Sequence, residues 1–467
     1  MKIEQLYTKC LSEAAYYIES DGQAAIIDPL RETEPYLQKL KENNVQLRYV
    51  FETHFHADFV SGHVDLANQT GARVVFGPEA ETSFPAHIAT DGEAFQIGKL
   101  TIKVLHTPGH TLESVCYLLL DEKGKECAIF TGDTLFIGDV GRPDLAIKSD
   151  LTQEDLAGML YDSLRNKIMP LPNHITVYPA HGAGSACGKS MSKETFDTLG
   201  NQKLSNYALD IKLSKADFIK ELTTGIMPPP QYFSKNAMLN KNGYRNIDEV
   251  ISQGDTALSL TEFQQWKAQG ALVLDVRSPQ TFCKGFIPGA LNIGLDGSFA
   301  VWVGTLIADL QQAIVLIVDE ERSHEAVLRL ARVGYDNVKG FLKGGISSWV
   351  DGNQPIESIE SISPEEFENR VENKTVDEVL DVRKPGEYEA EHLCVAKSHP
   401  LDFIRNTWSD LNQNKTYYIH CAGGYRSMIF SSILKQHGFN HIVEVQGGYG
   451  QLKKTKLERT SNPCLVN

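Results

Sequence analysis

Short apolar runs separated by turn signals fill the chain from residue 1 to about residue 200, and such runs predict strands. Several of them are followed at once by a His or an Asp residue. The examples are 47–51 before His54, 100–105 before His106, 128–130 before Asp133 and 175–178 before His181. Polar side chains at strand ends meet at one rim of a sheet. The pattern therefore predicts a sheet-rich domain with a functional site on one edge.

The second half of the chain contains an internal repeat. The run Leu272-Val-Leu-Asp-Val-Arg277 returns as Val379-Leu-Asp-Val-Arg383, and Gly344-Gly345 returns as Gly447-Gly448. A period of about 100 residues fits two copies of one domain better than a solenoid, whose units are shorter. In each copy β-rich runs alternate with helical patterns, which is typical of a parallel sheet covered by helices.

A less regular stretch joins the two halves and contains prolines 228–230, which resist helix and strand interiors. We interpret it as an extension of the first domain that ends in a linker near residue 250. A length of 467 residues is typical of about three domains. The predicted domains are 1–250, 251–356 and 357–467.

Composition narrows the class of protein. The 60 acidic residues outnumber the 45 basic ones, and the net charge of −15 argues against nucleic-acid or membrane-surface partners. No apolar run approaches the length of a membrane-spanning helix, and the first residues do not resemble a secretory signal. Eight scattered cysteines without a C-x-x-C pair indicate reduced thiols. We therefore expect a cytoplasmic protein.

Three potential metal ligands, His54, His56 and Asp58, lie within five residues on a predicted loop. At alternating positions they can turn to one side and meet ligands from other strand ends. The further candidates are His110 in T-P-G-H, Asp133 in T-G-D and His181 in P-A-H. A single loop histidine is more often a capping group. The joint pattern favours a metal site.

These motifs resemble those of the metallo-β-lactamase superfamily over nearly all of the first 200 residues. The resemblance implies a four-layer αβ/βα sandwich with the site on one edge. Members that hold two zinc ions usually carry a His directly after the Asp of the first motif, where this chain has Phe59. A phenyl ring cannot ligate a metal, so Asp58 and His181 lack their usual companion. One metal per chain is expected.

The resemblance leaves His54, His110 and Asp133 as the ligands of that metal. Two imidazoles and one carboxylate, with three open positions, suit non-haem Fe(II), which can bind O2 and a substrate side by side. A closed structural zinc site takes four protein ligands. We therefore expect one Fe(II) per chain. Glyoxalase II enzymes share the scaffold and the early motifs, so a metal-dependent thioester hydrolase stays an alternative.

Other residues are expected near the metal or the substrate. The resemblance to single-iron members implies that His56 and His181 hydrogen-bond to ligands or bound water. Tyr178 is either a similar partner or a buried structural tyrosine. Arg142 either acts near the substrate or forms a surface salt bridge. Cys187 either meets a persulfide intermediate or is a packing group.

A second candidate site lies between a predicted strand at 417–420 and a predicted helix at 427–436. It consists of Cys421, Ala422, Gly423, Gly424, Tyr425 and Arg426. The glycines let successive N–H groups face one centre, and the helix adds its positive end there. Such a cradle holds a thiolate and a sulfur or oxyanion group. A buried structural Cys is the alternative, but Gly-Gly and a nearby Arg are poor choices for plain packing.

This loop, together with Asp381-Val-Arg383 and Gly447-Gly448, resembles rhodanese domains over about 100 residues. Related Cys phosphatases place five residues between Cys and Arg, whereas this loop has four, and the smaller cradle suits a sulfane sulfur. Cys421 is therefore expected to carry sulfur as a persulfide. The middle repeat resembles a rhodanese domain without a Cys in its loop, where Asp319-Glu-Glu321 would repel anions. We interpret it as a structural or docking module.

The whole chain resembles fusions of a persulfide dioxygenase with rhodanese domains that act in sulfide detoxification. The expected fold class is a multidomain α/β protein, in which the sandwich precedes two doubly wound parallel-sheet domains. The resemblance implies oxidation of a low-molecular-weight persulfide with O2 to sulfite, with thiosulfate formed or used by Cys421. It also suggests a homo-oligomer. The two activities on one chain raise the effective concentration of a shared intermediate.

Overall fold

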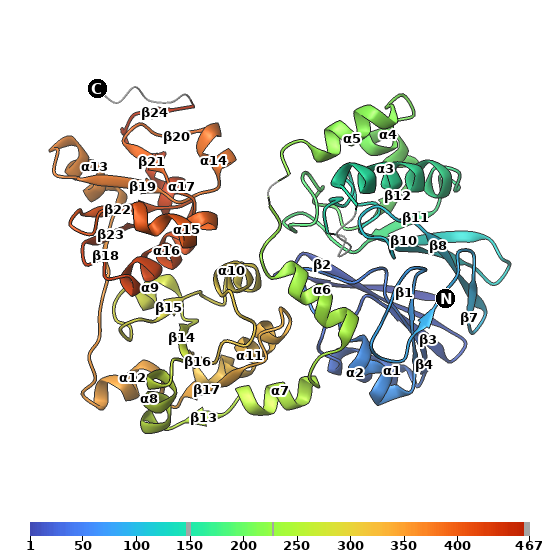
Figure 1. Ribbon diagram of the computed structural model, residues 1–467, viewed down its shortest axis with the longest axis horizontal. Helices are drawn as coiled ribbons and strands as arrows, with labels where there is room; N and C mark the ends of the chain where they lie inside the picture. The colour runs from blue at the N-terminus through green and yellow to red at the C-terminus, as the bar shows by residue number, and fades with distance from the viewer. Residues whose placement is uncertain (146–150, 227, 462–467) are drawn as a thin grey trace. The chain divides into compact units, whose positions relative to one another are not determined.

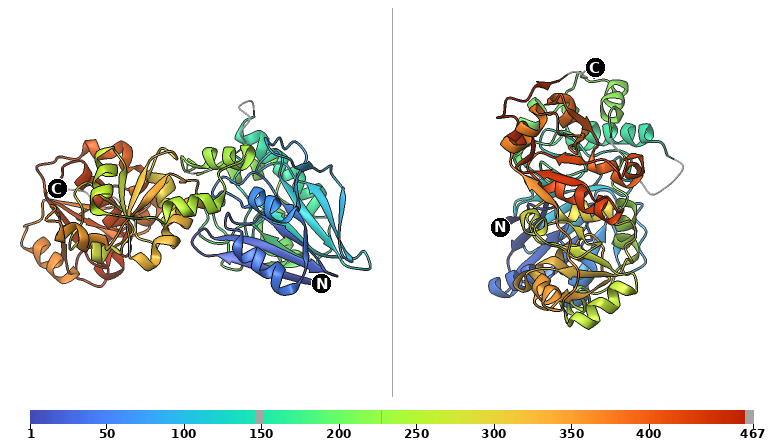
Figure 2. Two further views of the ribbon diagram at one scale, coloured as in Figure 1. Left: turned by 90° about the horizontal axis from the view of Figure 1, so that it is seen from below. Right: turned by 90° about the vertical axis from the view of Figure 1, so that its left-hand side faces the viewer.

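The computed structural model describes residues 1–145, 151–226 and 228–461 (Figures 1 and 2). Contacts divide the chain into two compact units. The first comprises residues 1–249 and 330–335, and the second comprises 250–329 and 336–467. The three predicted domain ranges stay a prediction. Near residue 250, where a linker was expected, the chain forms helix α7, Ile247–Gly254.

Two six-stranded sheets form the first unit. Strands β1 to β6 follow chain order in one sheet and span Lys2–Thr8, Glu13–Ser20, Gln23–Ile27, Gln46–Phe51, Arg73–Phe76 and His87–Ile88. The other sheet has the order β12-β11-β10-β9-β8-β7. Its strands β7 to β12 span Ala94–Ile97, Leu100–His106, Val115–Leu120, Glu126–Gly132, Thr176–Pro179 and Asp197–Thr198.

Helices cover the outer face of each of these sheets (Figure 1). Helices α1 to α6 span Glu34–Asn43, His63–Thr70, Gln153–Ser163, Leu199–Ser205, Lys215–Thr223 and Phe233–Asn242. Strand β2 shows how the layers are built. Its Tyr16 and Ile18 lie in the core between the sheets, whereas Ala15 and Tyr17 lie in the core beneath α1 and α2. The predicted four-layer sandwich is confirmed.

The second unit contains the two repeats, and each forms a five-stranded sheet. The orders are β13-β17-β16-β14-β15 and β18-β23-β22-β19-β21, and all neighbouring strands are parallel. Strands β13 to β17 span Ala257–Leu258, Leu272–Asp275, Leu291–Asn292, Ile314–Ile317 and Val338–Leu342. Strands β18, β19, β21, β22 and β23 span Glu360–Ile362, Glu378–Asp381, Ala396–Ser398, Tyr417–His420 and Ile442–Val445. The same order in both copies confirms the repeat of a doubly wound domain.

Ten α-helices, α8 to α17, lie between these strands or after the last of them in the described residues. Helices α8 to α12 span Leu260–Ala268, Pro279–Phe282, Phe299–Leu306, Ser323–Ala331 and Gly345–Asp351. Helices α13 to α17 span Pro364–Glu372, Pro385–Ala390, Ile404–Thr407, Tyr425–Gln436 and Gly448–Leu452. Strands β20, His392–Leu393, and β24, Arg459–Thr460, form a short separate pair.

Two expectations from composition concern the whole chain. Among the described residues, no helix is both long and apolar enough to cross a membrane. All seven cysteines in the described ranges are free thiols. The eighth, Cys464, lies outside them.

Candidate metal centre and thiol loop

The three expected ligands meet at the ends of three strands: His54 follows β4, His110 follows β8 and Asp133 follows β10. The Nε2 atoms of His110 and His54 lie 3.3 Å and 3.9 Å from Asp133 Oδ2. All three side chains are buried, and neither carboxylate oxygen of Asp133 has a hydrogen-bond partner in the described part of the chain. A buried carboxylate in this state calls for a cation. The residues fit a bound metal ion.

Hydrogen bonds fix which nitrogen each imidazole offers. The Nδ1–H group of His110 donates to the carbonyl oxygen of Arg142 (2.8 Å), which leaves Nε2 as the ligand atom. Thr53 Oγ1 donates to Asp28 Oδ2 (2.8 Å), so Nδ1–H of His54 donates to the same hydroxyl (3.0 Å). Burial, followed by the neighbouring histidines, holds the pKa of His54 well below its usual value. His54 is therefore neutral, as a metal ligand must be.

Two glycines allow the ligand loops to approach this closely. At Gly141 a Cβ atom would lie 2.1 Å from the Asp133 carbonyl oxygen and 2.8 Å from His110 Nδ1. At Gly132 the backbone has a φ of +50°, and a Cβ would lie 2.6 Å from the Thr53 side chain. These contacts explain the glycine within the T-G-D motif and the glycine before Arg142.

His56 lies beside one of the three ligands, with its ring centroid 4.2 Å from that of His54. Its Nε2 atom lies 3.1 Å from Asp28 Oδ1 and 3.6 Å from Glu52 Oε2. Burial disfavours the protonated ring, but Asp28, Glu52 and Asp58 outweigh it and raise the pKa of His56 to about 9. The ring of Phe59 packs on the imidazole with centroids 4.4 Å apart. The predicted hydrogen bond from His56 to a ligand therefore stays a prediction.

Asp58 and His181 form a second group of potential metal ligands beside His54, His110 and Asp133. Nε2 of His181 lies 3.5 Å from Asp58 Oδ2 and 3.5 Å from Asp133 Oδ1. A ligand atom of His56 lies within 4.8 Å of this pair. Burial, followed by Asp133, raises the pKa of Asp58, although His181 opposes the shift. The side chains expected around a second ion are thus present except for the donor at Phe59.

Cys187 lies close to the metal ligands. Its Sγ atom is within 4.8 Å of ligand atoms of Asp133 and His181, and the side chain is buried. Burial, followed by Asp58 and Asp133, raises the pKa of its thiol well above the usual value. The thiol is therefore protonated at neutral pH.

Arg142 and Tyr178 occupy different surroundings. The Arg142 guanidinium forms two hydrogen bonds to Asp144 (2.6 and 2.7 Å), and its Nη1 donates to the Ala186 carbonyl oxygen. Tyr178 packs in the core between the sheets, where its ring stacks on Phe130 with centroids 5.4 Å apart. This placement favours the packing interpretation of Tyr178.

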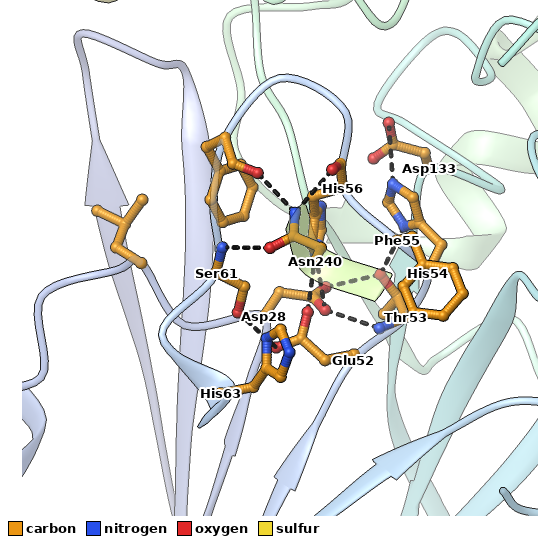
Figure 3. A network of polar contacts seen from close by, with 12 residues as sticks. Asp28, Glu52, Thr53, His54, Phe55, His56, Ser61, His63, Asp133 and Asn240 are labelled. Carbon is orange, nitrogen blue, oxygen red and sulfur yellow. Dashed lines mark hydrogen bonds and ion pairs between the residues drawn. The ribbon is translucent and has the colours of Figure 1, made fainter. Parts of the chain in front are cut away.

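Sequence reasoning missed the residue that holds the first metal-binding loop in place. Nδ2 of Asn240, in α6, donates to the carbonyl oxygens of His56 (2.7 Å) and Phe59 (2.8 Å), and its Oδ1 accepts from the Ser61 N–H group (Figure 3). The side chain is buried. Asn240 lies in the stretch interpreted as an extension, and nothing in the local sequence marks it.

In the thiol loop one backbone N–H group contacts the sulfur, and the full cradle stays a prediction. Cys421 follows β22 and is buried, whereas Ala422 and Gly423 are exposed. The Gly424 N–H group donates to Cys421 Sγ (3.1 Å), and Gly424 has a φ of +102°, which favours glycine. Helix α16 begins at the next residue, Tyr425, whose hydroxyl donates to the Gly294 carbonyl oxygen of the middle repeat (2.7 Å). The middle repeat therefore supports this loop.

Ion pairs lie beside the thiol loop and at the end of one strand in each repeat. Arg426 forms two hydrogen bonds to Glu387 (2.6 and 2.9 Å), which fix its guanidinium beside the loop. Asp381 and Arg383 form a buried ion pair at the end of β19. The Asp275–Arg277 pair does the same in the middle repeat.

Comparisons with known proteins agree with this architecture. Residues 8–181 match the metallo-beta-lactamase superfamily model, and residues 259–351 and 363–455 each match the rhodanese-like domain model. A metallo-beta-lactamase structure from Staphylococcus aureus subsp. aureus COL is 33% identical, with a TM-score of 0.65, and the match covers 73% of this chain and 98% of that one.

Two kinds of curated relatives share the first domain. Human mitochondrial persulfide dioxygenase ETHE1 is 31% identical over 211 residues, which are 45% of this chain and 74% of that protein. A probable hydroxyacylglutathione hydrolase of Schizosaccharomyces pombe is 33% identical over 166 residues, which are 35% of this chain and 60% of the hydrolase. The chain thus spans less than two thirds of that hydrolase. With its fold, ligand motifs and matched segments together, the chain belongs to the metallo-β-lactamase superfamily and carries two rhodanese-like domains.

Proposed function

We propose that the first domain is a non-haem iron persulfide dioxygenase and that the last domain is a sulfurtransferase. The substrates would be O2, one water molecule and a low-molecular-weight thiol persulfide, and the products would be sulfite, two protons and the free thiol. The observation that carries the proposal is the set His54, His110 and Asp133, beside a second group whose remaining donor position is Phe59. One Fe(II) per chain is part of the proposal.

The protein residues have separate tasks in this reaction. His54, His110 and Asp133 would hold Fe(II), which when bound supplies the oxygen chemistry that the persulfide sulfur requires. Thr53 and the Arg142 carbonyl oxygen orient the two imidazoles. The three ligand side chains are at most 2% exposed, so bulk water has little access to them.

Cys421 would carry sulfur in the last domain. Its thiolate attacks the outer sulfur of a persulfide or thiosulfonate, and the S–S bond of the donor breaks with its electron pair on the leaving group. The Gly424 N–H group and the start of α16 stabilise the anionic sulfur. Sulfite from the first domain and a sulfane sulfur on Cys421 would give thiosulfate, or the reverse reaction would supply persulfide. We place both in sulfide detoxification in the cytoplasm, in a homo-oligomer.

Oxygen uptake with glutathione persulfide, on protein purified without air and assayed for metal, tests the dioxygenase. We expect uptake with about one iron per chain and its loss in His110→Ala, because one ligand is removed. Sulfur transfer from thiosulfate should persist in that variant, because Cys421 lies in the other compact unit. An unchanged unfolding transition of the first unit is the folding control. Retained oxygen uptake in His110→Ala contradicts the ligand role.

A second candidate is a metal-dependent thioester hydrolase with an appended sulfurtransferase. The match to hydroxyacylglutathione hydrolase and the second group of His56, Asp58 and His181 favour it. Two zinc ions per chain together with S-lactoylglutathione hydrolysis would support the hydrolase. Oxygen uptake with no thioester hydrolysis would exclude it.

A further inference from the structure

A chain of buried hydrogen bonds leads from the Cys421 thiol to a carboxylate that the proposed transfer reaction does not use. Cys421 Sγ donates to Ser427 Oγ (3.6 Å), and Ser427 Oγ donates to Glu444 Oε1 (3.2 Å). The other carboxylate oxygen, Glu444 Oε2, accepts from Ser361 Oγ (2.8 Å). Cys421, Ser427 and Glu444 are at most 4% exposed. Both links of the chain donate toward the carboxylate, as a proton path from the thiol requires.

The position of Glu444 follows from the sheet. In β23 it pairs with Ile419 of β22, two residues before Cys421. Its Oε1 atom lies 3.4 Å from the place that a Cβ atom on Gly424 would occupy, so the carboxylate sits against the thiol loop. Ser427 lies in the first turn of α16 and bridges the two groups.

A buried carboxylate at this place is costly for the fold. Its hydrogen bonds from Ser361 and Ser427 come from neutral hydroxyls, which compensate a buried charge only in part. Burial raises the pKa of Glu444, and these two hydroxyls lower it less. A carboxylate with a raised pKa is a stronger proton acceptor than an ordinary one.

The middle repeat provides an internal comparison at the same positions. There the neighbouring strands pair Ala257 with Phe341, whereas the last domain pairs Ser361 with Glu444. The following pairs, Leu258 with Leu342 and Ile362 with Val445, have the same register, so the two sites correspond.

The residue at the position of Cys421 also differs between the two repeats. Strand partners Asp275 and Ile317 correspond to Asp381 and His420, so Val318 stands where the last domain has Cys421. The fold therefore accepts an apolar pair at this position. Ser361 and Glu444 occur in the repeat that has the Cys421 thiol.

We infer that Glu444 is a positioning residue that accepts the Cys421 proton through Ser427. The S–H bond of Cys421 breaks and its electron pair stays on sulfur. Ser427 Oγ takes that proton while its own proton moves to Glu444 Oε1. When an acceptor later removes the sulfane sulfur, the Cys421 sulfur leaves with the electron pair and regains the proton by the same path. No oxidant or reductant is needed.

This inference rests on the proposed transferase role of Cys421, and other ionisable groups surround the path. Burial lowers the pKa of Arg426 in α16, but its partner Glu387 of α14, followed by Cys421 and Asp402, raises it above its usual value. His420, directly before the thiol, is buried near Asp381. Burial, followed by the charge of Glu444, raises the pKa of Cys283 in the middle repeat.

The test is the pH dependence of Cys421 alkylation by iodoacetamide in the full chain, from about pH 5 to about pH 10, read by mass spectrometry of the Cys421 peptide. In the unaltered protein, Cys421 should still be alkylated at acidic pH, until the pH is low enough to protonate Glu444. Glu444→Gln and Ser427→Ala should abolish this alkylation at acidic pH and lower the alkylation rate near pH 6 by about tenfold or more. Ser427→Thr keeps a hydroxyl and should keep the alkylation at acidic pH.

Controls separate this effect from a loss of structure. Glu360→Gln removes an exposed carboxylate from β18 of the same sheet and should leave the profile unchanged. Alkylation of Cys10 and Cys394 is read in the same samples, so that a change confined to Cys421 is distinguished from a general one. An equal or faster alkylation rate in Glu444→Gln at every pH, or a uniform fall without a change in profile, overturns the inference. The expected profiles without any sulfur transfer from thiosulfate or glutathione persulfide would leave the relay standing and refute the proposed transferase.

Discussion

The Nδ1 atom of His110 lies 2.8 Å from the carbonyl oxygen of Arg142, in the turn that directly follows Gly141. This contact fixes the imidazole so that Nε2 faces Asp133. The ligand geometry therefore depends on a backbone atom that only a residue without a side chain at position 141 can bring so close.

Gly141→Ala should lower the iron content about tenfold, because the new Cβ would collide with the Asp133 carbonyl oxygen and His110 Nδ1. Metal analysis after purification without air measures the effect. Gly386→Ala is the matched control, since a Cβ atom added there would meet no atom within 4 Å and its φ is ordinary. Equal iron content in both variants would contradict the steric argument.

Cys421→Ser should abolish sulfur transfer from thiosulfate and leave oxygen uptake within about twofold of the unaltered protein. The serine hydroxyl is a poor sulfur carrier, while the metal ligands lie in the other compact unit. Paired assays of both activities on one preparation measure this. A parallel loss of both activities would show that the division of labour is wrong.

Asn240→Ala should lower the unfolding transition of the first unit by about 5 to 10 °C, because it leaves three buried backbone groups of the metal-binding loop without partners. Differential scanning calorimetry measures the shift. Asn242→Ala is the control, since this side chain of the same helix accepts one exposed hydrogen bond from Ser83. The same shift in both variants would mean that Asn240 does not hold the loop.

Much of this architecture could be predicted from local patterns. The repeat follows from the spacing of its motifs, and the resemblance of the ligand motifs to the metallo-β-lactamase superfamily implied the sandwich and the approach of His54, His110 and Asp133. The turn between Cys421 and α16 also follows, because Gly424 has a positive φ that favours glycine.

Contacts between distant segments could not be predicted. Asn240 donates to the carbonyl oxygen of His56, which is 184 positions away in the sequence. Glu444 accepts from Ser427 of α16, and its own place in β23 depends on the register of the whole sheet. The partners of His56 were not predicted either: its Nε2 atom lies near Asp28, which follows β3, and near Glu52, which follows β4. A side chain's partner in a core is decided by packing, which motif spacing does not encode.

Phe59→His should restore a donor beside Asp58 and His181 and raise the bound metal from about one to about two ions per chain when zinc is supplied. Zinc titration with metal analysis measures this number. Phe59→Leu removes the ring without adding a donor and should bind about one ion. A second ion in Phe59→Leu, or in the unaltered protein, would show that Phe59 does not set the metal count.

Glu444→Gln should raise the melting temperature of the second unit at neutral pH and have little effect near pH 4. Because burial raises the pKa of Glu444, the folded protein binds this proton more tightly than the unfolded chain does. The contribution of the carboxyl to stability is full below its usual pKa and is lost as the pH rises through the raised value. At neutral pH the group thus destabilises the fold, and a neutral amide does not.

Calorimetry at the two pH values, with Glu360→Gln as the exposed control, measures the difference. A lower melting temperature of Glu444→Gln at neutral pH would show that the carboxylate is present for stability, and not for the thiol.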